Sequence, residues 1–301
     1  MSNYIYINDV GPRDGLQNQA TILDPQTRIE LIKRLIDAGI PGVEICSFVN
    51  PKAVPAMSGA DEIVKAFASN QTCDLSVLVP NMKGYELAKD AGAKTVTVVP
   101  SATETMNQKN INMSLEETLE SAKDILKTAT ADNLNTRAYI SVAWECPYEG
   151  KVDSARILSM AYQLLEAGAS ELILADTIGA TNPKDVSALF NQIIQNIDPS
   201  ILSAHFHDTR ALGLANVVAS LNEGISKFDA CIGGLGGCPF APGAAGNLAT
   251  EDLCSMLHQM GYETNVDLIK LLDTVEYVSQ QLEKDIGGRM TPWFRKSLYP
   301  A

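Results

Sequence analysis

The sequence lacks the features that mark secreted, zinc-binding and membrane proteins. Its six cysteines are scattered and no two have CxxC spacing, so we expect free, buried thiols rather than a disulfide framework or structural zinc. No apolar run approaches the roughly 20 residues of a transmembrane helix. Residues 1–10 resemble neither a signal peptide nor an arginine-rich transit peptide. We therefore expect a cytoplasmic protein without membrane partners.

Basic residues are also scarce relative to acidic ones. The 301-residue chain has 23 Lys and Arg against 36 Asp and Glu, a formal net charge of −13. A surface of that sign repels phosphate backbones, so nucleic acid is not an expected partner. Hydrophobic residues make up 46% and charged residues 20%, which is typical of a folded domain and excludes a disordered or fibrous chain.

Short β-branched runs alternate with longer segments of helical periodicity. No GxGxxG turn follows the first run, which argues against a dinucleotide-binding sheet. Eight βα units favour one (β/α)₈ TIM-barrel domain: a barrel over about 4–262 and a C-terminal appendage over about 263–301, with an extra helix and an irregular end. The predicted strands are Tyr4–Val10, Gly42–Cys46, Leu75–Val79, Thr95–Val99, Arg137–Ala143, Glu171–Ala175, Leu202–His207 and Lys227–Cys231.

Polar side chains follow several of these predicted strands. In such barrels the chemistry gathers where the strands end, so side chains from different strands are expected at one mouth. A loop with six glycines and two prolines, residues 233–247, follows the eighth strand and carries Cys238. Its position favours a lid that brings the thiol inward, although a flexible connection is the alternative. The polar residues are Arg13, Asp14, Glu44, Ser47, Asp176, His205, His207 and Asp208.

Two of the three histidines, His205 and His207, are two residues apart at the end of the seventh strand. Alternate strand residues share a face, so both imidazoles can reach one ion; the alternative is a pair of core histidines. Asp14 and Asn247 supply candidate oxygen ligands, and such a set suits Mg²⁺ or Mn²⁺ better than structural zinc. The alternatives for the remaining acidic residues are direct ligation, orientation of the imidazoles or, for Asp208, capping of a helix; these residues are Glu44, Asp176 and Asp208.

Arg13 lies beside the proposed ligand Asp14. An arginine at this position is either a surface charge or, buried at the mouth, a group that holds a carbonyl or enolate oxygen.

Seven segments taken together resemble 3-hydroxy-3-methylglutaryl-CoA lyases, which belong to a wider group of metal-dependent barrels that includes Claisen-condensing synthases. The resemblance extends from about residue 8 to 275. The segments are RDGLQNQ (13–19), VEICSFVNPKAVPAM (43–57), KNINMS (109–114), CPYEGKV (146–152), ADTIGATNP (175–183), HFHDTRALGLAN (205–216) and GGLGGCPFAPGAAGNLATED (233–252).

The resemblance implies a reaction and a role for each matching residue. The reaction is cleavage of (S)-3-hydroxy-3-methylglutaryl-CoA to acetyl-CoA and acetoacetate, with Asp14 as the shuttle for the hydroxyl proton. An acyl-CoA substrate, a divalent metal (Mg²⁺ or Mn²⁺) and a homodimer or higher homo-oligomer are implied with it. The implied metal ligands are Asp14, His205, His207 and Asn247, the catalytic residues are Arg13, Asp14 and Cys238, and the substrate-binding or supporting residues are Gln17, Glu44, Ser47, Asn110 and Asp176.

Three departures from the family pattern leave the acyl group open. Glu145, beside Trp144, stands where a small residue is usual, residues 98–108 read VVPSATETMNQ, and a C-terminal cysteine is missing. A lyase for a related 3-hydroxyacyl-CoA is therefore the main alternative. A condensing synthase, which usually has an added regulatory domain, and a non-catalytic binding barrel are the others.

Overall fold

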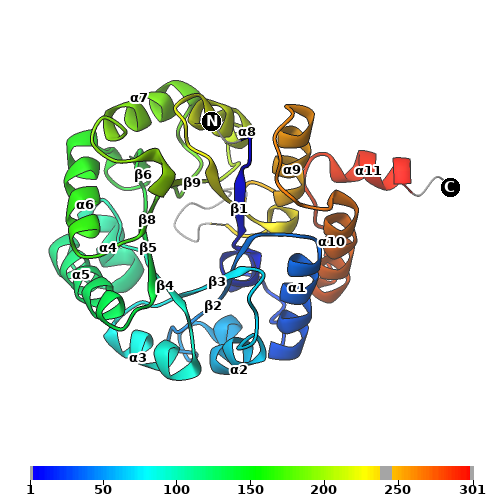
Figure 1. The fold of residues 1–301 in the computed structure, drawn as a ribbon, viewed down its shortest axis with the longest axis horizontal. Helices are drawn as coiled ribbons and strands as arrows, with labels where there is room; N and C mark the ends of the chain where they lie inside the picture. Colours follow the sequence, from blue (N-terminus) through cyan, green and yellow to red (C-terminus); the bar gives the residue numbers. More distant parts are fainter. Residues whose placement is uncertain (1–2, 238–245, 299–301) are drawn as a thin grey trace.

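The computed structural model describes residues 3–237 and 246–298, and its central feature is a closed barrel of eight parallel strands. The strand order around the barrel is β1-β10-β9-β8-β5-β4-β3-β2, with helices outside it (Figure 1). The predicted TIM barrel is therefore confirmed. The barrel strands are β1 (Tyr6–Asp9), β2 (Gly42–Ser47), β3 (Asp74–Leu78), β4 (Thr95–Val98), β5 (Asn135–Ile140), β8 (Glu171–Asp176), β9 (Leu202–Phe206) and β10 (Lys227–Ala230).

The helices surround the strands and alternate with them along the chain, as the segments of helical periodicity predicted. Side-chain caps define several starts: Ser114 and Glu117 form a capping box at the start of α5, and Asn182 caps α7. The helices are α1 (Pro25–Asp37), α2 (Ala60–Ala66), α3 (Met82–Ala91), α4 (Glu104–Ile111), α5 (Leu115–Ala131), α6 (Ser154–Glu166), α7 (Pro183–Ile193), α8 (Gly213–Asn222), α9 (Thr250–Gln259), α10 (Leu268–Leu282) and α11 (Thr291–Leu298). No described helix is long and apolar enough to cross a membrane.

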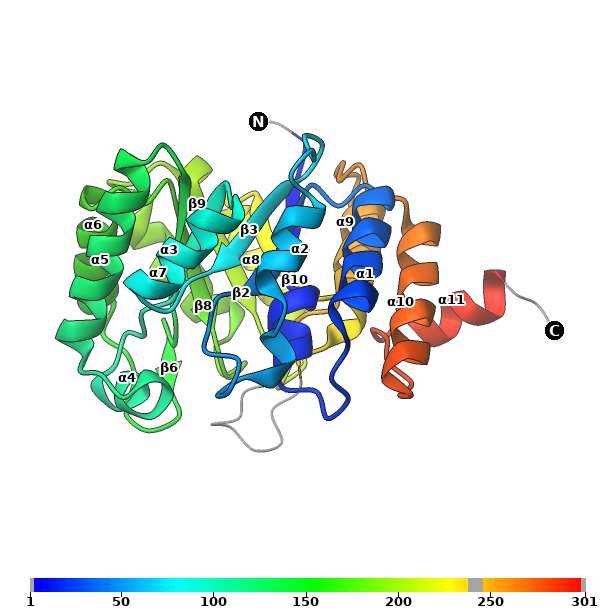
Figure 2. The same cartoon turned by 90° about the horizontal axis from the view of Figure 1, so that it is seen from below.

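Two local features differ from the sequence-based expectation. A short antiparallel hairpin, β6 (Glu145–Cys146) with β7 (Gly150–Lys151), follows β5. The predicted irregular C-terminus is wrong in part, because α11 forms there and projects away from the barrel (Figure 2). The Thr291 hydroxyl donates to the buried carboxylate of Glu251, which fixes the start of this helix to α9. α10 packs against α1 and α9.

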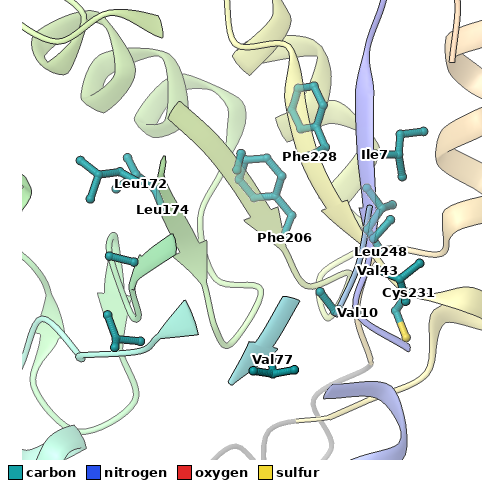
Figure 3. Close-up of a cluster of buried hydrophobic side chains, with 14 of the residues drawn as sticks. Ile7, Val10, Val43, Val77, Leu172, Leu174, Phe206, Phe228, Cys231 and Leu248 are labelled. Carbon is teal, nitrogen blue, oxygen red and sulfur yellow. The ribbon is translucent and has the colours of Figure 1, made fainter. Parts of the chain in front are cut away.

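The main apolar core lies between the strands and the helices. Successive strand residues face opposite sides, so Phe206 and Phe228 pack outward among other buried side chains (Figure 3), whereas their neighbours His205 and Asp229 meet inside the barrel. A separate small apolar cluster contains Tyr139 of β5 with Ile173 and Ala175 of β8. The barrel therefore holds polar groups inside a shell of hydrophobic packing.

Candidate active site

Asp14, His205 and His207 come together at the mouth of the barrel. One potential ligand atom from each lies within 4.8 Å of the others. Asp14 belongs to a single helical turn, η1 (Gly11–Gly15), that directly follows β1, while the two histidines are at the end of β9. The sequence predicted these three residues at one site, the two histidines from their spacing on a strand and Asp14 from its place after the first strand.

Asn247 lies beside the same cluster, as predicted. It forms an isolated β-bridge with His207, and its Nδ2 donates to Asp14 Oδ2 at 2.6 Å and to the Leu235 carbonyl at 3.0 Å. Its Oδ1 is buried without a hydrogen-bond partner. Gly236 permits this approach, because a Cβ there would lie 2.5 Å from Asn247 Nδ2 and its φ is +110°. The amide therefore offers a free oxygen beside three other candidate ligands.

Arg13 is buried and held by two carboxylates. Its Nε donates to Glu44 Oε2 at 2.5 Å and its Nη1 to Asp14 Oδ1 at 2.7 Å. Within the described residues Nη2 has no hydrogen-bond partner, and Arg13 lines the cavity at the mouth. Burial alone favours the neutral form of Asp14, but Arg13 and the two histidines lower the pKa of that carboxyl below its usual value. Arg13 therefore acts as a fixed cation rather than a surface charge.

The other predicted residues divide into those that reach the cavity and those that do not. Gln17 and Asn110 line it. Glu44 acts through Arg13, and the buried Ser47 hydroxyl lies outside the residues that line it. Asp176 accepts hydrogen bonds from the backbone N–H groups of residues 180 and 181, and burial raises its pKa to about 6. Asp208 accepts a hydrogen bond from the N–H of Gly213, the first residue of α8, although the N-cap residue itself is Leu212. Cys238 lies outside the described residues.

The sequence profile of the HMGL-like family matches residues 4–278. The chain belongs to this family. A hydroxymethylglutaryl-CoA lyase of Bacillus subtilis is 41% identical over 293 residues, which cover 97% of this chain and 98% of that protein. One from Pseudomonas mevalonii is 40% identical and covers 92% of each chain. HMGL-like membership confirms the resemblance and makes the chain a relative of carbon–carbon lyases.

Solved structures agree with this assignment. The Bacillus subtilis HMG-CoA lyase superimposes with a TM-score of 0.94 at 41% identity, covering 98% of this chain and 100% of that one. An HMG-CoA lyase from Acinetobacter baumannii, solved in complex with coenzyme A and 3-methylmalate, has a TM-score of 0.93 at 34% identity, covering 97% of this chain and 95% of that one.

Asp229 is a residue of the site that the sequence analysis missed. This fully buried carboxylate on β10 contacts His205 Nδ1 at 3.1 Å and accepts hydrogen bonds from Tyr139 and from Asn8 at 2.9 Å. Burial opposes its ionisation, but His205 and Arg137 outweigh that cost and hold its pKa at about 2. Because Asp229 occupies Nδ1, it leaves Nε2 of His205 for a ligand. The one signal in the sequence that could have identified Asp229 is an acidic residue within a strand that was predicted to be buried.

Arg28 is a second residue that was missed. This arginine of α1 is 1% exposed and donates to the carbonyls of Pro12 at 3.3 Å and Ile45 at 3.4 Å. Those carbonyls immediately precede Arg13 and follow Glu44 in the chain. Arg28 thus ties together the two backbone segments that carry the Arg13–Glu44 pair. On an amphipathic helix it looks like any surface arginine, so the sequence gives no signal for it.

Proposed function

We propose that this chain cleaves 3-hydroxy-3-methylglutaryl-CoA to acetyl-CoA and acetoacetate. The observation that carries the proposal is the cluster of Asp14, His205 and His207 beside the buried Arg13, in a chain about 40% identical to hydroxymethylglutaryl-CoA lyases over nearly its whole length. The cluster can hold a substrate hydroxyl while the guanidinium stabilises negative charge on the thioester oxygen.

A divalent cation, Mg²⁺ or Mn²⁺, fits the donor set. Asp14, His205, His207 and Asn247 would hold it, since carboxylate, imidazole and amide oxygen donors without a thiolate suit these ions. The buried Asn247 Oδ1, which lacks a partner, supports this assignment. A bound cation would lower the pKa of the substrate hydroxyl.

Residues of this chain carry out the remaining steps, which are proton removal, stabilisation of the enolate and its protonation. As the hydroxyl proton leaves, with Asp14 as its shuttle, the C2–C3 electron pair moves onto the thioester and forms an enolate. Arg13, fixed by Glu44 and Asp14, stabilises the enolate oxygen. A proton must finally reach the enolate carbon, and a thiol can donate it. We assign this donation to Cys238, which the resemblance implies is catalytic and whose chain neighbour Gly237 lines the cavity.

Replacing Cys238 with serine should lower kcat about 10²–10⁴-fold, the range for loss of a general acid, because a hydroxyl is a far weaker acid than a thiol. KM should change little. Steady-state kinetics measure kcat and KM. Cys254→Ser is the matched control, because Cys254 is buried in the apolar core between the strands and the helices. Near-normal turnover of the Cys238 variant would assign the acid to another group.

Asp229 should act on metal binding through His205. Asp229→Asn should weaken Mn²⁺ binding about 10–100-fold, the usual cost of losing a partner that orients a ligating imidazole. Calorimetric titration with Mn²⁺ measures this without reference to activity. Asn8→Ala is the control, since Asn8 donates to the carboxylate of Asp229 but does not contact His205. Equal Mn²⁺ affinity of the two variants would contradict the role.

Glu145 should have little influence on which acyl group the enzyme accepts. Its carboxylate lies 3.7 Å from Arg210 Nη2, and both residues line a separate cavity of about 400 Å³. A half-exposed ion pair is worth at most about 1 kcal/mol, so Glu145→Gln should change kcat/KM by less than about five-fold. Arg210→Gln, which breaks the same pair from the other side, is the matched variant. A ten-fold change confined to Glu145→Gln would show that the carboxylate faces substrate.

One assay tests the proposed function. The purified protein with Mg²⁺ or Mn²⁺ is given a panel of 3-hydroxyacyl-CoA thioesters, and acetyl-CoA is measured. Release from the 3-hydroxy-3-methylglutaryl thioester is expected. Release only from another thioester would favour the related-lyase alternative, and no release from any thioester would contradict lyase activity. Cytoplasmic location and homo-oligomeric assembly stay predictions of the sequence.

A further inference from the structure

Another buried arginine, Arg137, lies inside the barrel. It is the third residue of β5 and is 6% exposed. Its Nη2 donates to Glu171 Oε1 at 2.7 Å and to Asp229 Oδ1 at 3.4 Å. β8 and β9 separate β5 from β10 in the barrel, so the contact with Asp229 crosses the interior. Arg137 therefore reaches the carboxylate that contacts the candidate ligand His205.

Glu171 holds the guanidinium of Arg137 in place from the other side. Its Oε1 also accepts from Arg137 Nε at 3.2 Å, and the Ser203 hydroxyl donates to the same oxygen at 2.7 Å. Lys227 Nζ lies 3.6 Å from Glu171 Oε2. Two cations therefore face two carboxylates, which leaves the charge of Arg137 available to Asp229.

Asp229 needs a permanent cation, because a buried carboxylate stays charged only beside a compensating charge. Its side chain is fully buried, and its partners among the ion pairs of the described residues are Arg137 and His205. An imidazole that ligates a metal ion is neutral, so His205 supplies no positive charge once an ion is bound. Arg137 is then the cation that keeps Asp229 an acceptor for the Nδ1–H of His205. Nε2 of the imidazole keeps its lone pair for the ligand position.

We propose that Arg137 is a positioning residue for the metal ligand His205 and acts through Asp229; this inference rests on the proposed function, because it concerns the same cluster. Glu171 and Lys227 are the first residues of β8 and β10, so the group that fixes Arg137 lies at the end of the strands opposite the mouth. The affinity of the mouth for its cation is then set in part from the other end of the barrel. An ion pair that only stabilises the fold is the alternative, and metal affinity separates the two.

Arg137→Met should weaken Mn²⁺ binding about 10-fold, the lower end of the range for groups that orient a ligating imidazole. Calorimetric titration with Mn²⁺ reports the dissociation constant and the number of sites separately. Unfolded protein lowers the number of sites, whereas a misplaced imidazole raises the dissociation constant. A dissociation constant within about two-fold of the wild-type value, even with a lower melting temperature, overturns the inference and leaves Arg137 a structural role.

A double variant shows whether the effect passes through Asp229, and it decides the question even if Arg137→Met alone fails to fold. Arg137→Met with Asp229→Asn removes one charge of each sign, so no unpaired charge is left buried. Its Mn²⁺ affinity should equal that of Asp229→Asn, because the carboxylate through which Arg137 acts is already gone. A further loss of about 10-fold in the double variant would mean that the two side chains act independently, and it would contradict the inference.

Arg295→Met is the matched control. Arg295 of α11 also pairs with two carboxylates, those of Glu276 and Asp285, but outside the barrel, and its loss should leave Mn²⁺ affinity unchanged. An equal loss of affinity in Arg295→Met and Arg137→Met would contradict the inference. Acetyl-CoA release by the wild-type enzyme keeps the two proposals apart. Cleavage of 3-hydroxy-3-methylglutaryl-CoA, with unchanged Mn²⁺ affinity in Arg137→Met, overturns this inference alone. A wild-type enzyme that neither binds Mn²⁺ nor cleaves the thioester contradicts both.

Discussion

His207→Ala should lower kcat/KM for 3-hydroxy-3-methylglutaryl-CoA at least about 10³-fold, since a metal ion typically supplies several kcal/mol of transition-state stabilisation. The imidazole is one of three side chains whose ligand atoms converge within 4.8 Å, so its loss leaves too few donors to hold the ion. Mn²⁺ affinity should fall with activity. Treatment with EDTA should abolish turnover of the wild-type enzyme, and added Mg²⁺ or Mn²⁺ should restore it.

The third histidine is a matched control for this prediction. His258 lies in α9 and contacts the Thr264 hydroxyl at 2.7 Å, away from the cluster. His258→Ala should leave Mn²⁺ affinity unchanged, as measured by calorimetry, and circular dichroism should show both variants folded. Full activity in excess EDTA, or unaltered Mn²⁺ binding by His207→Ala, would contradict a metal site at this position.

How well each strand could be predicted depends on how far neighbouring residues in the sequence determine it. β9 was predicted as a short run between two helical segments, with its two histidines on one face, and the structure has Phe206 outside and His205 inside the barrel. All eight barrel strands were predicted to within two or three residues. The exact end residues of the strands differ from the prediction, because a strand ends where its hydrogen bonds to the neighbouring strand end. β5, for example, ends at Ile140 rather than at residue 143.

Contacts between distant segments explain what sequence reasoning missed. The segment of α11 looks irregular in sequence because Gly287 and Gly288 precede it and Pro292 stands in its first turn. Glu251 and Asp252 of α9 accept hydrogen bonds from the backbone N–H groups of residues 288–290 and so fix the start of the helix. Asp229 and Arg28 were overlooked for the same reason: their partners lie on other elements.

The same reasoning shows why the candidate ligands could be found. Asp14, His205 and His207 follow strands, and parallel strands of a barrel all end at one mouth, so topology alone brings them together. Asn247 is different. It lies beyond the glycine-rich loop, and its place depends on the backbone bridge to His207 and on the absence of a side chain at Gly236.

Arg13→Met should lower kcat about 10²–10³-fold with a smaller change in KM, as expected when a group that stabilises the charge of the transition state is removed. Arg13→Lys should recover little of this loss, because an ammonium cannot bond Glu44 and Asp14 at once with the fork geometry of the guanidinium. Steady-state kinetics on the methylglutaryl thioester measure both variants.

Arg13 could instead matter only for stability, by neutralising Glu44. A variant of Glu44 distinguishes this structural role from stabilisation of the enolate. This carboxylate is 0% exposed, and removing Arg13 leaves it buried without its cation, at a cost of about 3–5 kcal/mol of stability. The double variant Arg13→Met with Glu44→Gln removes that unpaired charge and should regain most of the lost melting temperature. If the arginine stabilises the enolate, kcat of the double variant stays low even though its stability returns. Recovery of kcat together with stability would show instead that Arg13 only neutralises Glu44.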